Sequence, residues 1–225
     1  MRAFWAAVVA ATLLVGAGPA VAQQSGENPQ ATVDAAAATV KELSADSGYR
    51  DIAAYLHRAK GVMVVPQLLK AGLIVGGQVG DAVVLSRTKD GGWSAPAFYQ
   101  LAGGSIGLQI GAEASQVIIA IMTDKGLNQL MTEQVKVGVD ASISVGTVGG
   151  GAGASSVGSL KADMVSFSRS KGLFGGGALD GSLIRPQPER NAAYYGAGTK
   201  VEDILIQRSV SNAGAAKLQA ALSAR

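Results

Sequence analysis

The feature that most constrains the fold is a series of short apolar segments, punctuated by glycine, that extends from residue 61 to residue 122. Each segment has the length and β-branched content of a strand, and Gly, Pro66 or an Asp-Gly-Gly turn signal closes it. The segments occupy residues 62–65, 73–79, 82–87, 97–101, 105–110 and 116–122. Because 31 of the 225 residues are Gly, which is roughly twice ordinary usage, we expect many tight turns and bulges in a β-rich fold.

Residues 135–145 have the clearest strand pattern in the chain. The six odd positions are all apolar, and the even positions between them hold Lys, Gly, Asp and Ser. Such strict alternation predicts one continuous strand with a buried face and a polar face. Apolar runs at residues 160–169 and 178–185 predict two further strands.

Helical patterns lie near both ends of the chain. Residues 31–43 and 51–60 predict two helices before the first strand, and residues 213–224 predict a last, Ala-rich helix. Thr199 begins a T-x-x-E capping-box pattern that predicts a further helix through residue 206. We therefore expect an α+β fold, in which an antiparallel, Gly-rich sheet forms a β-sandwich or a partly closed barrel with helices near the N- and C-terminal ends. The order of the strands stays open.

The first 22 residues have the organisation of a secretory signal peptide. Arg2 supplies the positive start, residues 3–18 are almost wholly apolar, and an Ala-Val-Ala sequence precedes the expected cleavage point. Residues 23–30 are polar and predict a flexible mature N-terminus, whereas residues 31–225 predict a single domain because no linker divides them. We expect an exported protein of a bacterial periplasm or cell envelope. Without Cys, it has no lipid anchor on an N-terminal cysteine.

The composition also excludes several classes of chemistry. With no Cys and a single His, the chain has no disulfide framework, no thiolate nucleophile and no multi-histidine metal site. A G-x-S-x-G pattern at residues 103–107 would need a histidine downstream of its serine, but His57 lies upstream. The sequence contains neither a Walker A pattern nor G-x-G-x-x-G. We therefore expect a protein that is not an enzyme and uses no metal or cofactor.

The charge of the chain gives no support to a nucleic-acid partner. The 19 Lys and Arg residues exceed the 16 Asp and Glu residues by only three, and removal of Arg2 with the signal peptide lowers this excess to two. The sequence also lacks the basic run with which proteins follow a phosphate backbone. We expect no nucleic acid among the partners.

A set of motifs with a characteristic order begins at residue 59. They are A-K-G-V-M-V-V-P at 59–66, K-A-G-L-I-V-G-G at 70–77, G-W-S-A-P-A-F at 92–98, S-I-G-L-Q-I-G at 105–111, S-R-S-K-G-L-F at 168–174, and Asn191 with Y-Y-G at 194–196. Over roughly residues 35–206 the chain resembles the SYLF domain, a family of lipid-binding modules in eukaryotes and in exported bacterial proteins. The resemblance implies binding of anionic lipid, including phosphoinositides for eukaryotic members, and binding of actin for fungal members.

Two of these implied properties are not carried over to this chain. Eukaryotic members resemble one another in a basic amphipathic N-terminal helix, whereas residues 31–43 hold Lys41 as their one cation against Asp34 and Glu42. The phosphoinositide mode of binding is therefore not expected here. Actin is absent from a bacterial envelope, so actin is not expected as a partner in this compartment.

Binding to a membrane surface requires apolar groups that enter the interface and cations near the headgroups, each cation contributing about 1 kcal/mol. Two places in the sequence offer both, the run before the Gly triplet at residues 175–177 and the surroundings of a turn expected at Pro66. The predicted lipid-binding residues are Arg58, Lys60, Lys70, Arg169, Lys171, Leu173 and Phe174. The alternative for the apolar members, and for Leu68 and Leu69, is a place in the core.

We therefore expect an exported, non-enzymatic module that contacts anionic phospholipid membranes through a basic and apolar surface loop. Two alternatives remain open at this stage. One is a structural or protein-interaction module that binds a protein partner in the cell envelope. The other is a carrier that holds a lipid in an internal apolar cavity.

Overall fold

One sheet of eight strands organises the part of the chain that the computed structural model describes, which comprises residues 28–46, 50–72, 75–106, 111–146, 162–171 and 179–224. The spatial order is β5-β8-β3-β2-β1-β4-β7-β6, and all neighbours are antiparallel except β6 and β7, which are parallel. The strands are β1 (Gly61–Gly72), β2 (Val75–Ser86), β3 (Ala97–Ile106), β4 (Gly111–Ile121), β5 (Val135–Lys136), β6 (Ile143–Val145), β7 (Met164–Lys171) and β8 (Leu183–Pro186).

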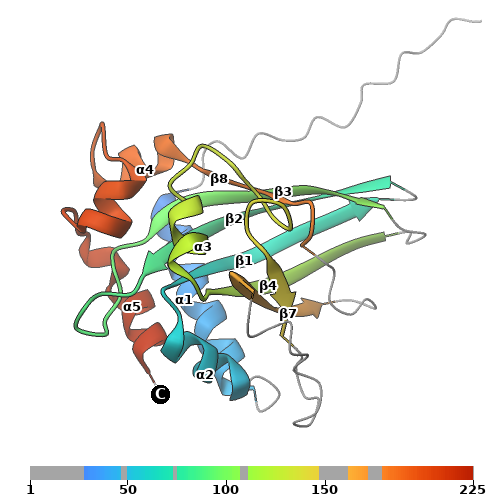
Figure 1. Ribbon diagram of the computed structural model, residues 1–225, viewed down its shortest axis with the longest axis horizontal. Coiled ribbons are helices and arrows are strands. Elements are labelled where there is room, and N and C mark those ends of the chain that lie inside the picture. Colours follow the sequence, from blue (N-terminus) through green and yellow to red (C-terminus); the bar gives the residue numbers. More distant parts are fainter. Residues whose placement is uncertain are drawn as a thin grey trace, which may run out of the picture.

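Helices from both ends of the sequence cover one face of this sheet (Figure 1). α1 begins at Pro29 because Asn28 caps it, its side chain accepting a hydrogen bond from the backbone N of Gln30. The helical elements are α1 (Pro29–Ala45), α2 (Arg50–Arg58), α3 (Asp124–Gln129), α4 (Pro188–Tyr195), the π-helix η2 (Asp203–Gln207), the 3₁₀-helix η3 (Ala213–Ala215) and α5 (Ala216–Ser223). None of these described helices is both long enough and apolar enough to cross a membrane.

The two faces of the sheet bury separate apolar clusters. On the face that we call the helix face, side chains such as Val62 and Ile118 pack against α1, α2 and α5. On the opposite face, Met63 and Ile119 belong to a cluster that also includes Val135 of the edge strand β5. Ile143 of the other edge strand, β6, packs against that same cluster. Because both edges turn toward it, the sheet is a curled half-barrel, and we call this side the inner face.

The expected α+β fold with a partly closed barrel and helices near both ends is confirmed, in the form of a single curled sheet. The expected helices at residues 31–43 and 51–60 correspond to α1 and α2, and the last helix corresponds to η3 and α5. α1 begins inside the segment 23–30 that was expected to be flexible. The signal peptide expected at residues 1–22, like all residues up to 27, lies outside the described part of the chain.

The prediction of one strand over residues 135–145 is wrong. The backbone reverses at Gly138, whose φ is +85°, and the carboxylate of Asp140 accepts a hydrogen bond from the backbone N of Lys136 at 2.7 Å. Val139 is consequently 70% exposed, although its place in the alternation assigns it to the buried face. The segment instead connects β5 and β6, which are the two opposite edges of the sheet.

The strands are longer than the apolar segments, because Gly lies within them more often than between them. The expected segments 73–79 and 82–87 share the single strand β2, and 97–101 and 105–110 share β3, apart from positions outside the described residues. Pro66 does not end the first strand either, since β1 continues to Gly72. The strands expected at 160–169 and 178–185 begin later, as β7 and β8.

The capping box expected at Thr199 does not form. The hydroxyl of Thr199 donates to the carbonyl of Gly196, and the backbone N of Lys200 donates to Asp203, so the helical turn passes into the π-helix η2. Two short helices were not predicted. α3 is capped by Thr123, and α4 carries Pro188 in its first turn.

Candidate functional site

A bulge in the middle of β1 determines which side chains the outer part of the sheet exposes. Between Val65 and Leu68, β1 has one residue more than its partner β4, and a matching shift occurs against β2. Pro66 lies in this bulge and has no N–H to donate to a ladder. Leu68 therefore stays in the inner cluster, and Leu69 emerges on the helix face with 41% of its surface exposed.

Leu69 belongs to a row of residues that face one another across four neighbouring strands. Val79 of β2 is opposite Leu69 and is 38% exposed, and on the other side Leu69 is opposite Ala114 of β4. We call Val79, Leu69 and Ala114 the apolar row. Ala114 is in turn opposite Lys171, the last residue of β7. The row thus runs from an exposed apolar pair to the strand that carries the predicted basic residues.

Arg169 lies two residues before Lys171 and shares its side of the strand, opposite Gln116 of β4. Arg169 has no ion pair with any described residue. The nearest acid along this part of α1, Glu42, accepts a hydrogen bond from the side-chain amide of Gln116 at 2.9 Å. The apolar row is therefore followed by a cation whose charge is not cancelled by an ion pair within the described chain.

Two open grooves lie along α1 above the bulge. The larger, about 350 Å³, separates the first half of α1 from β1, β2 and β3, and Leu69 and Val79 are part of its lining. The smaller, about 270 Å³, lies toward Gln116 on β4. The grooves share Ala35, Pro66 and Gln67. They exist because α1 presents Ala side chains at this level, which are too short to fill the space above the strands.

α1 is held over the grooves by polar contacts to the C-terminal part of the chain. Arg190 of α4 forms an ion pair with Asp81 of β2 at 2.5 Å and donates to the hydroxyl of Thr32 on α1. Gln187 donates to the same carboxylate at 2.9 Å. Only 14% of the Arg190 side chain and 16% of the Asp81 side chain are exposed. The one acid in the lining of the larger groove is therefore neutralised by a buried arginine.

The predicted lipid-binding residues fall at two opposite ends of the sheet. Arg58 ends α2, and Lys60 precedes β1 and forms an exposed ion pair with Asp124 at 3.6 Å. Lys70 lies ten residues further along the strand, which corresponds to about 33 Å. The group expected around a turn at Pro66 is thus not one site, because Pro66 lies within the strand.

Lys70 and Arg169 share one end of the sheet but not one face. Lys70 is opposite Gln78 and Glu113 on the inner face, whereas Arg169 is on the helix face. Lys171 ends β7, and its side chain, like Leu173 and Phe174, lies outside what the structure describes. The residue that the sequence analysis missed is Val79. Its place beside Leu69 follows from the register of β1 and β2, which the sequence pattern does not contain.

The described residues assemble no catalytic constellation. Ser105 of the G-x-S-x-G pattern lies within strand β3 and not on the strand-to-helix turn that exposes a nucleophile. Within the described ranges, no three His, Cys, Asp or Glu residues gather where they could hold a metal ion. What the outer end of the sheet offers is an exposed apolar row, two grooves and neighbouring cations.

A single curled sheet with helices on one face defines an α+β fold. Residues 102–225 match the family described as "Las17-binding protein actin regulator" (Ysc84). The chain belongs to this family, the SYLF-domain family that its motifs resemble. The description is that of a binding protein and regulator.

Curated relatives match over the larger part of the chain. LAS seventeen-binding protein 3 of Saccharomyces cerevisiae is 34% identical over 158 residues, which are 68% of this chain and 34% of the relative. Protein YSC84 of the same yeast is 33% identical over 157 residues, 68% of this chain and 33% of the relative. SH3 domain-containing YSC84-like protein 1 of Mus musculus is 31% identical over 150 residues, 66% of this chain and 44% of the relative. The chain thus spans less than half the length of these relatives.

Proposed function

We propose that this chain is a non-enzymatic module that binds anionic phospholipid surfaces through the outer end of its helix face. The observation that carries the proposal is the apolar row, which ends beside the basic strand β7. Leu69 and Val79 supply apolar surface for the interface, and Arg169 and Lys171 supply positive charge for the headgroups. Leu173 and Phe174, which follow Lys171 in the sequence, are further candidates for apolar contact with the membrane in this proposal.

The combination of groups favours a membrane over a purely apolar ligand. Interfacial binding gains free energy from buried apolar area and from cations near anionic headgroups, at about 1 kcal/mol for each cation. The apolar row supplies the first contribution and β7 the second. The open grooves along α1 favour a second candidate, a carrier that holds one acyl chain of a lipid against Ala35 and Leu69.

Vesicle co-sedimentation tests the proposal. We expect the protein to sediment with phosphatidylcholine vesicles that contain phosphatidylglycerol, more weakly at high salt, and not with phosphatidylcholine alone. Arg169→Glu with Lys171→Glu should weaken binding about tenfold or more, because two attractive charges become repulsive. The matched control, Lys136→Glu with Arg185→Glu, reverses two exposed cations elsewhere and should bind as the unchanged protein does.

Two results would decide against this function. Equal binding to neutral and anionic vesicles would remove the electrostatic part of the proposal. No sedimentation, together with a co-purified lipid in native mass spectrometry, would favour the carrier, and a stoichiometric protein partner from envelope extract would favour an interaction module.

We also propose that residues 1–22 direct export to a bacterial periplasm or cell envelope and are then removed. The support is the positive, apolar and small-residue sequence of this segment. The mass of the protein recovered from the envelope fraction tests this. An N-terminus at Gln23 is expected, and recovery of the whole chain from the cytoplasm would contradict the proposal.

A further inference from the structure

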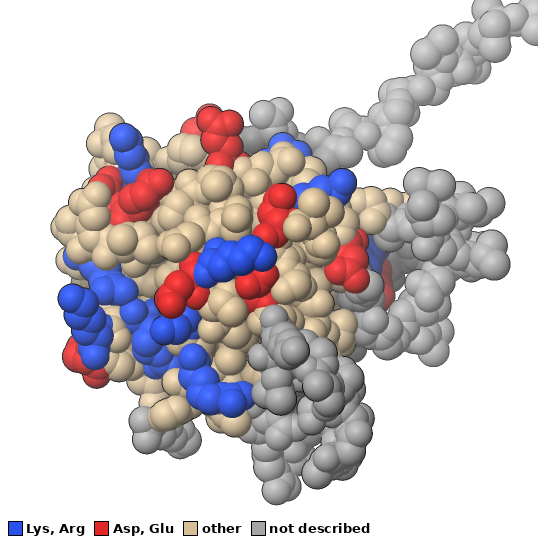
Figure 2. Space-filling model, viewed as in Figure 1, with Lys and Arg blue, Asp and Glu red and all other residues tan. Residues whose placement is uncertain are grey.

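Five cations from three segments of the chain gather at the end of the sheet where β1 begins, far from the outer end of the apolar row. Figure 2 shows Lys and Arg side chains gathered on the lower left of the molecule, over α2 and the β2–β3 hairpin. These residues, which we call the basic end, are Arg58, Lys60, Arg87, Lys89 and Arg208. The charge of this surface is a product of the fold, because the fold brings together residues 58–60, residues 87–89 and Arg208.

Contacts to backbone carbonyls bring the segments together. The backbone N of Arg87 donates to the carbonyl of Lys60 at 2.8 Å, and the guanidinium of Arg87 donates to the carbonyl of Leu56 on α2. Arg208 donates from Nη2 to the carbonyl of Arg87 at 2.7 Å. The hairpin, α2 and the segment after η2 therefore form one continuous surface.

Arg87 and Arg208 are held in place by contacts within the fold, whereas Arg58, Lys60 and Lys89 are exposed. The guanidinium of Arg87 lies 3.8 Å from the centre of the Trp93 ring and donates to Gly91. Arg208 has φ 55°, the one positive φ among the described non-glycine residues, and directly follows the π-helix η2. Strained backbone and π-helical turns occur disproportionately at functional sites.

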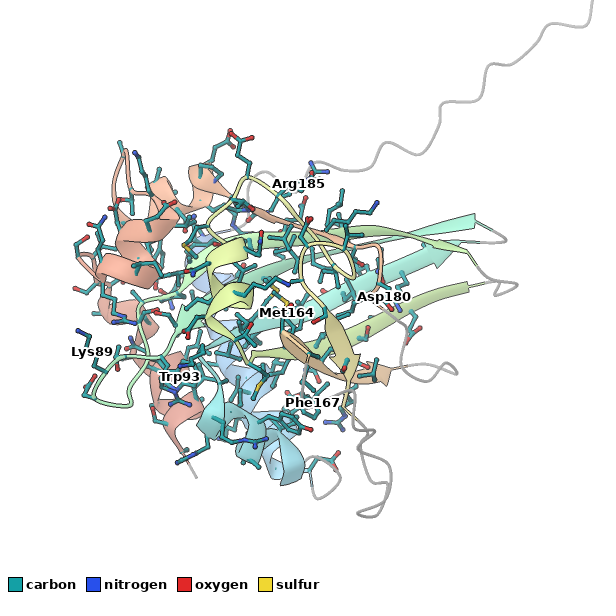
Figure 3. The ribbon with its side chains drawn as sticks, in the orientation of Figure 1. Lys89, Trp93, Met164, Phe167, Asp180 and Arg185 are labelled. Atoms are coloured by element: carbon teal, nitrogen blue, oxygen red, sulfur yellow. The ribbon has the colours of Figure 1, made fainter. Side chains whose placement is uncertain are left out.

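The segment that carries Arg208 also exposes a large apolar side chain. Lys60 and Lys89 are exposed, and Ile206, two residues before Arg208, is 44% exposed. Two exposed acids lie among these cations: Asp124, paired with Lys60, and Asp90, next to Lys89 in the hairpin. Lys89 and Trp93 occupy the same end of the molecule in Figure 3, whereas Arg185 and Asp180 lie well away from it.

We propose that the basic end is a docking surface for an acidic segment of another protein, one that also presents an apolar residue to Ile206. An extended peptide can place its carboxylates opposite Lys89 and Arg58 and can replace the exposed Asp124 as the partner of Lys60, while it avoids Asp90. A uniformly anionic bilayer would meet these acids as well, and it would find little apolar surface to bury. The surface is independent of the apolar row and of the lipid function proposed above.

Fluorescence anisotropy with a defined probe tests this assignment. The probe is a short fluorescein-labelled peptide of Glu and Gly around one central Leu, and its counterpart carries Gln in place of Glu. Saturable binding of the Glu peptide to the full chain at low salt, weaker at high salt, is expected, without binding of the Gln peptide. Lys60→Glu with Lys89→Glu should weaken binding about tenfold, because two attractive contacts become repulsive.

Lys136→Glu with Arg185→Glu is the matched control, and it should leave peptide affinity within about twofold, because these cations lie outside the basic end. Lys89→Gln, a single change in the hairpin, serves if the double variant does not fold, and it should still weaken binding measurably. Equal affinity of the basic-end variants and the control would overturn the proposal. A second result would also overturn it. If the peptide does not bind, and Lys60→Glu with Lys89→Glu reduces retention on phosphatidylglycerol vesicles, the surface serves a membrane.

Discussion

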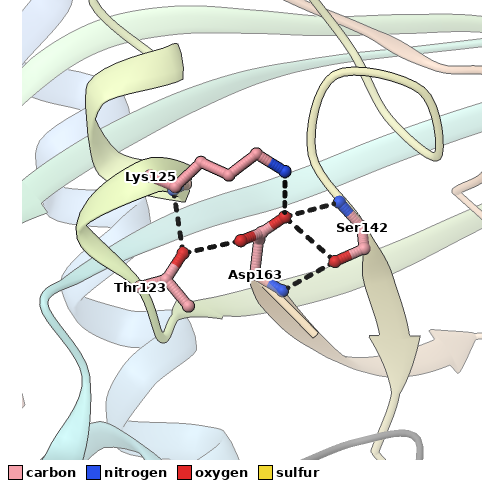
Figure 4. A network of polar contacts seen from close by, with 5 residues as sticks. Thr123, Lys125, Ser142 and Asp163 are labelled. Carbon is pink, nitrogen blue, oxygen red and sulfur yellow. Dashed lines mark hydrogen bonds and ion pairs between the residues drawn. The ribbon is translucent and has the colours of Figure 1, made fainter. Parts of the chain in front are cut away.

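Asp163 and Ser142 hold each other through three hydrogen bonds (Figure 4). The backbone N and the hydroxyl of Ser142 each donate to one carboxylate oxygen of Asp163 at 3.0 Å, and the backbone N of Asp163 donates to the hydroxyl at 2.9 Å. Ser142 immediately precedes β6 and Asp163 immediately precedes β7. The pair therefore sets the register of the one parallel pair of strands that the structure describes.

The same carboxylate also positions α3. The hydroxyl of Thr123 donates a hydrogen bond to Oδ1 of Asp163 at 2.7 Å and accepts one from the backbone N of Gly126. The ammonium group of Lys125 donates to Oδ2 of Asp163 at 3.0 Å. Burial acts to raise the pKa of Asp163, but the hydrogen bonds from Thr123, Ser142 and Lys125 outweigh it and lower this pKa to about 2. The charged form is thus the form that the fold requires.

Replacing Asp163 by Asn should lower the free energy of unfolding by about 2 kcal/mol, the value that corresponds to the lowered pKa. Urea unfolding followed by tryptophan fluorescence measures this change. Asp34→Asn, at an exposed position on α1, is the control and should change the free energy by less than about 0.5 kcal/mol. A loss no larger than that of the control would contradict the assigned role of the carboxylate.

The contribution of Asp163 should also depend on pH. The pKa of the carboxyl is about 2 in the folded chain and near 3.8 in the unfolded chain, so its stabilisation is complete above pH 3.8. As the pH falls toward 2, the unfolded chain binds the proton first and the stabilisation is lost. The difference in unfolding free energy between the unchanged protein and Asp163→Asn should therefore shrink as urea titrations are repeated at lower pH. A constant difference would be inconsistent with this mechanism.

Gly80 is required by the bulge in β1. A Cβ at this position would lie 2.6 Å from the carbonyl oxygen of Gln67 and 2.8 Å from a methyl group of Val65. Gly80→Ala should therefore destabilise the protein by about 1–3 kcal/mol, as overpacking does in a filled core. Gly104→Ala is the matched control, because a Cβ there meets nothing within 4 Å. Thermal unfolding of the two variants should separate them, and similar melting temperatures would contradict the close approach.

The ion pair between Arg190 and Asp81 should hold α1 in place. Arg190→Ala leaves Asp81 buried without its cation and removes a contact to Thr32, so we expect a loss of about 2–4 kcal/mol. Asp81→Ala with Arg190→Ala should cost less than the sum of the single changes. Hydrogen exchange of the α1 amides should accelerate in Arg190→Ala. Unchanged exchange in α1, or strict additivity of the two changes, would argue against a coupled clamp.

Leu69 and Ile206 form a matched pair for testing the membrane surface, since they are 41% and 44% exposed at opposite ends of the molecule. Leu69→Ser should weaken sedimentation with phosphatidylglycerol vesicles by about tenfold, as expected for losing one interfacial apolar side chain. Ile206→Ser should leave it unchanged. If Ile206→Ser weakened sedimentation and Leu69→Ser did not, the membrane contact would lie at the basic end.

Local sequence signals predicted the positions of most elements but not their limits. Apolar periodicity located β1, β4, α1 and α2, since each buries one continuous stripe or face. Gly separates the apolar segments of the sequence, yet Gly80 lies inside β2 because the neighbouring bulge occupies the space of a side chain. The alternation at 135–145 misled because burial alternates as in a strand only over residues 135–138, and the turn at Gly138 then exposes Val139.

The candidate site was predictable only in part, because its members meet through the order of the strands. Arg169 and Lys171 could be selected from the sequence as cations beside apolar residues. That Lys171 follows the row of Val79, Leu69 and Ala114, with Arg169 beside it, depends on β1 lying between β2 and β4, and on β7 lying beyond β4. Strand order is a non-local property, which no window of sequence contains.

The extra residue in β1 has a consequence for how this surface can change. Because side chains alternate along a strand, regular pairing of all the residues of β1, without the bulge, would place Lys70 on the helix face and turn Leu69 toward the barrel interior. The polarity of the outer half of the strand is therefore set by the bulge as much as by the chemistry of its residues. Deletion of Gln67 would leave both faces as they are, because Pro66 alone would then oppose Gln116, so the strand can lose this codon without exchanging its apolar surface for a charged one.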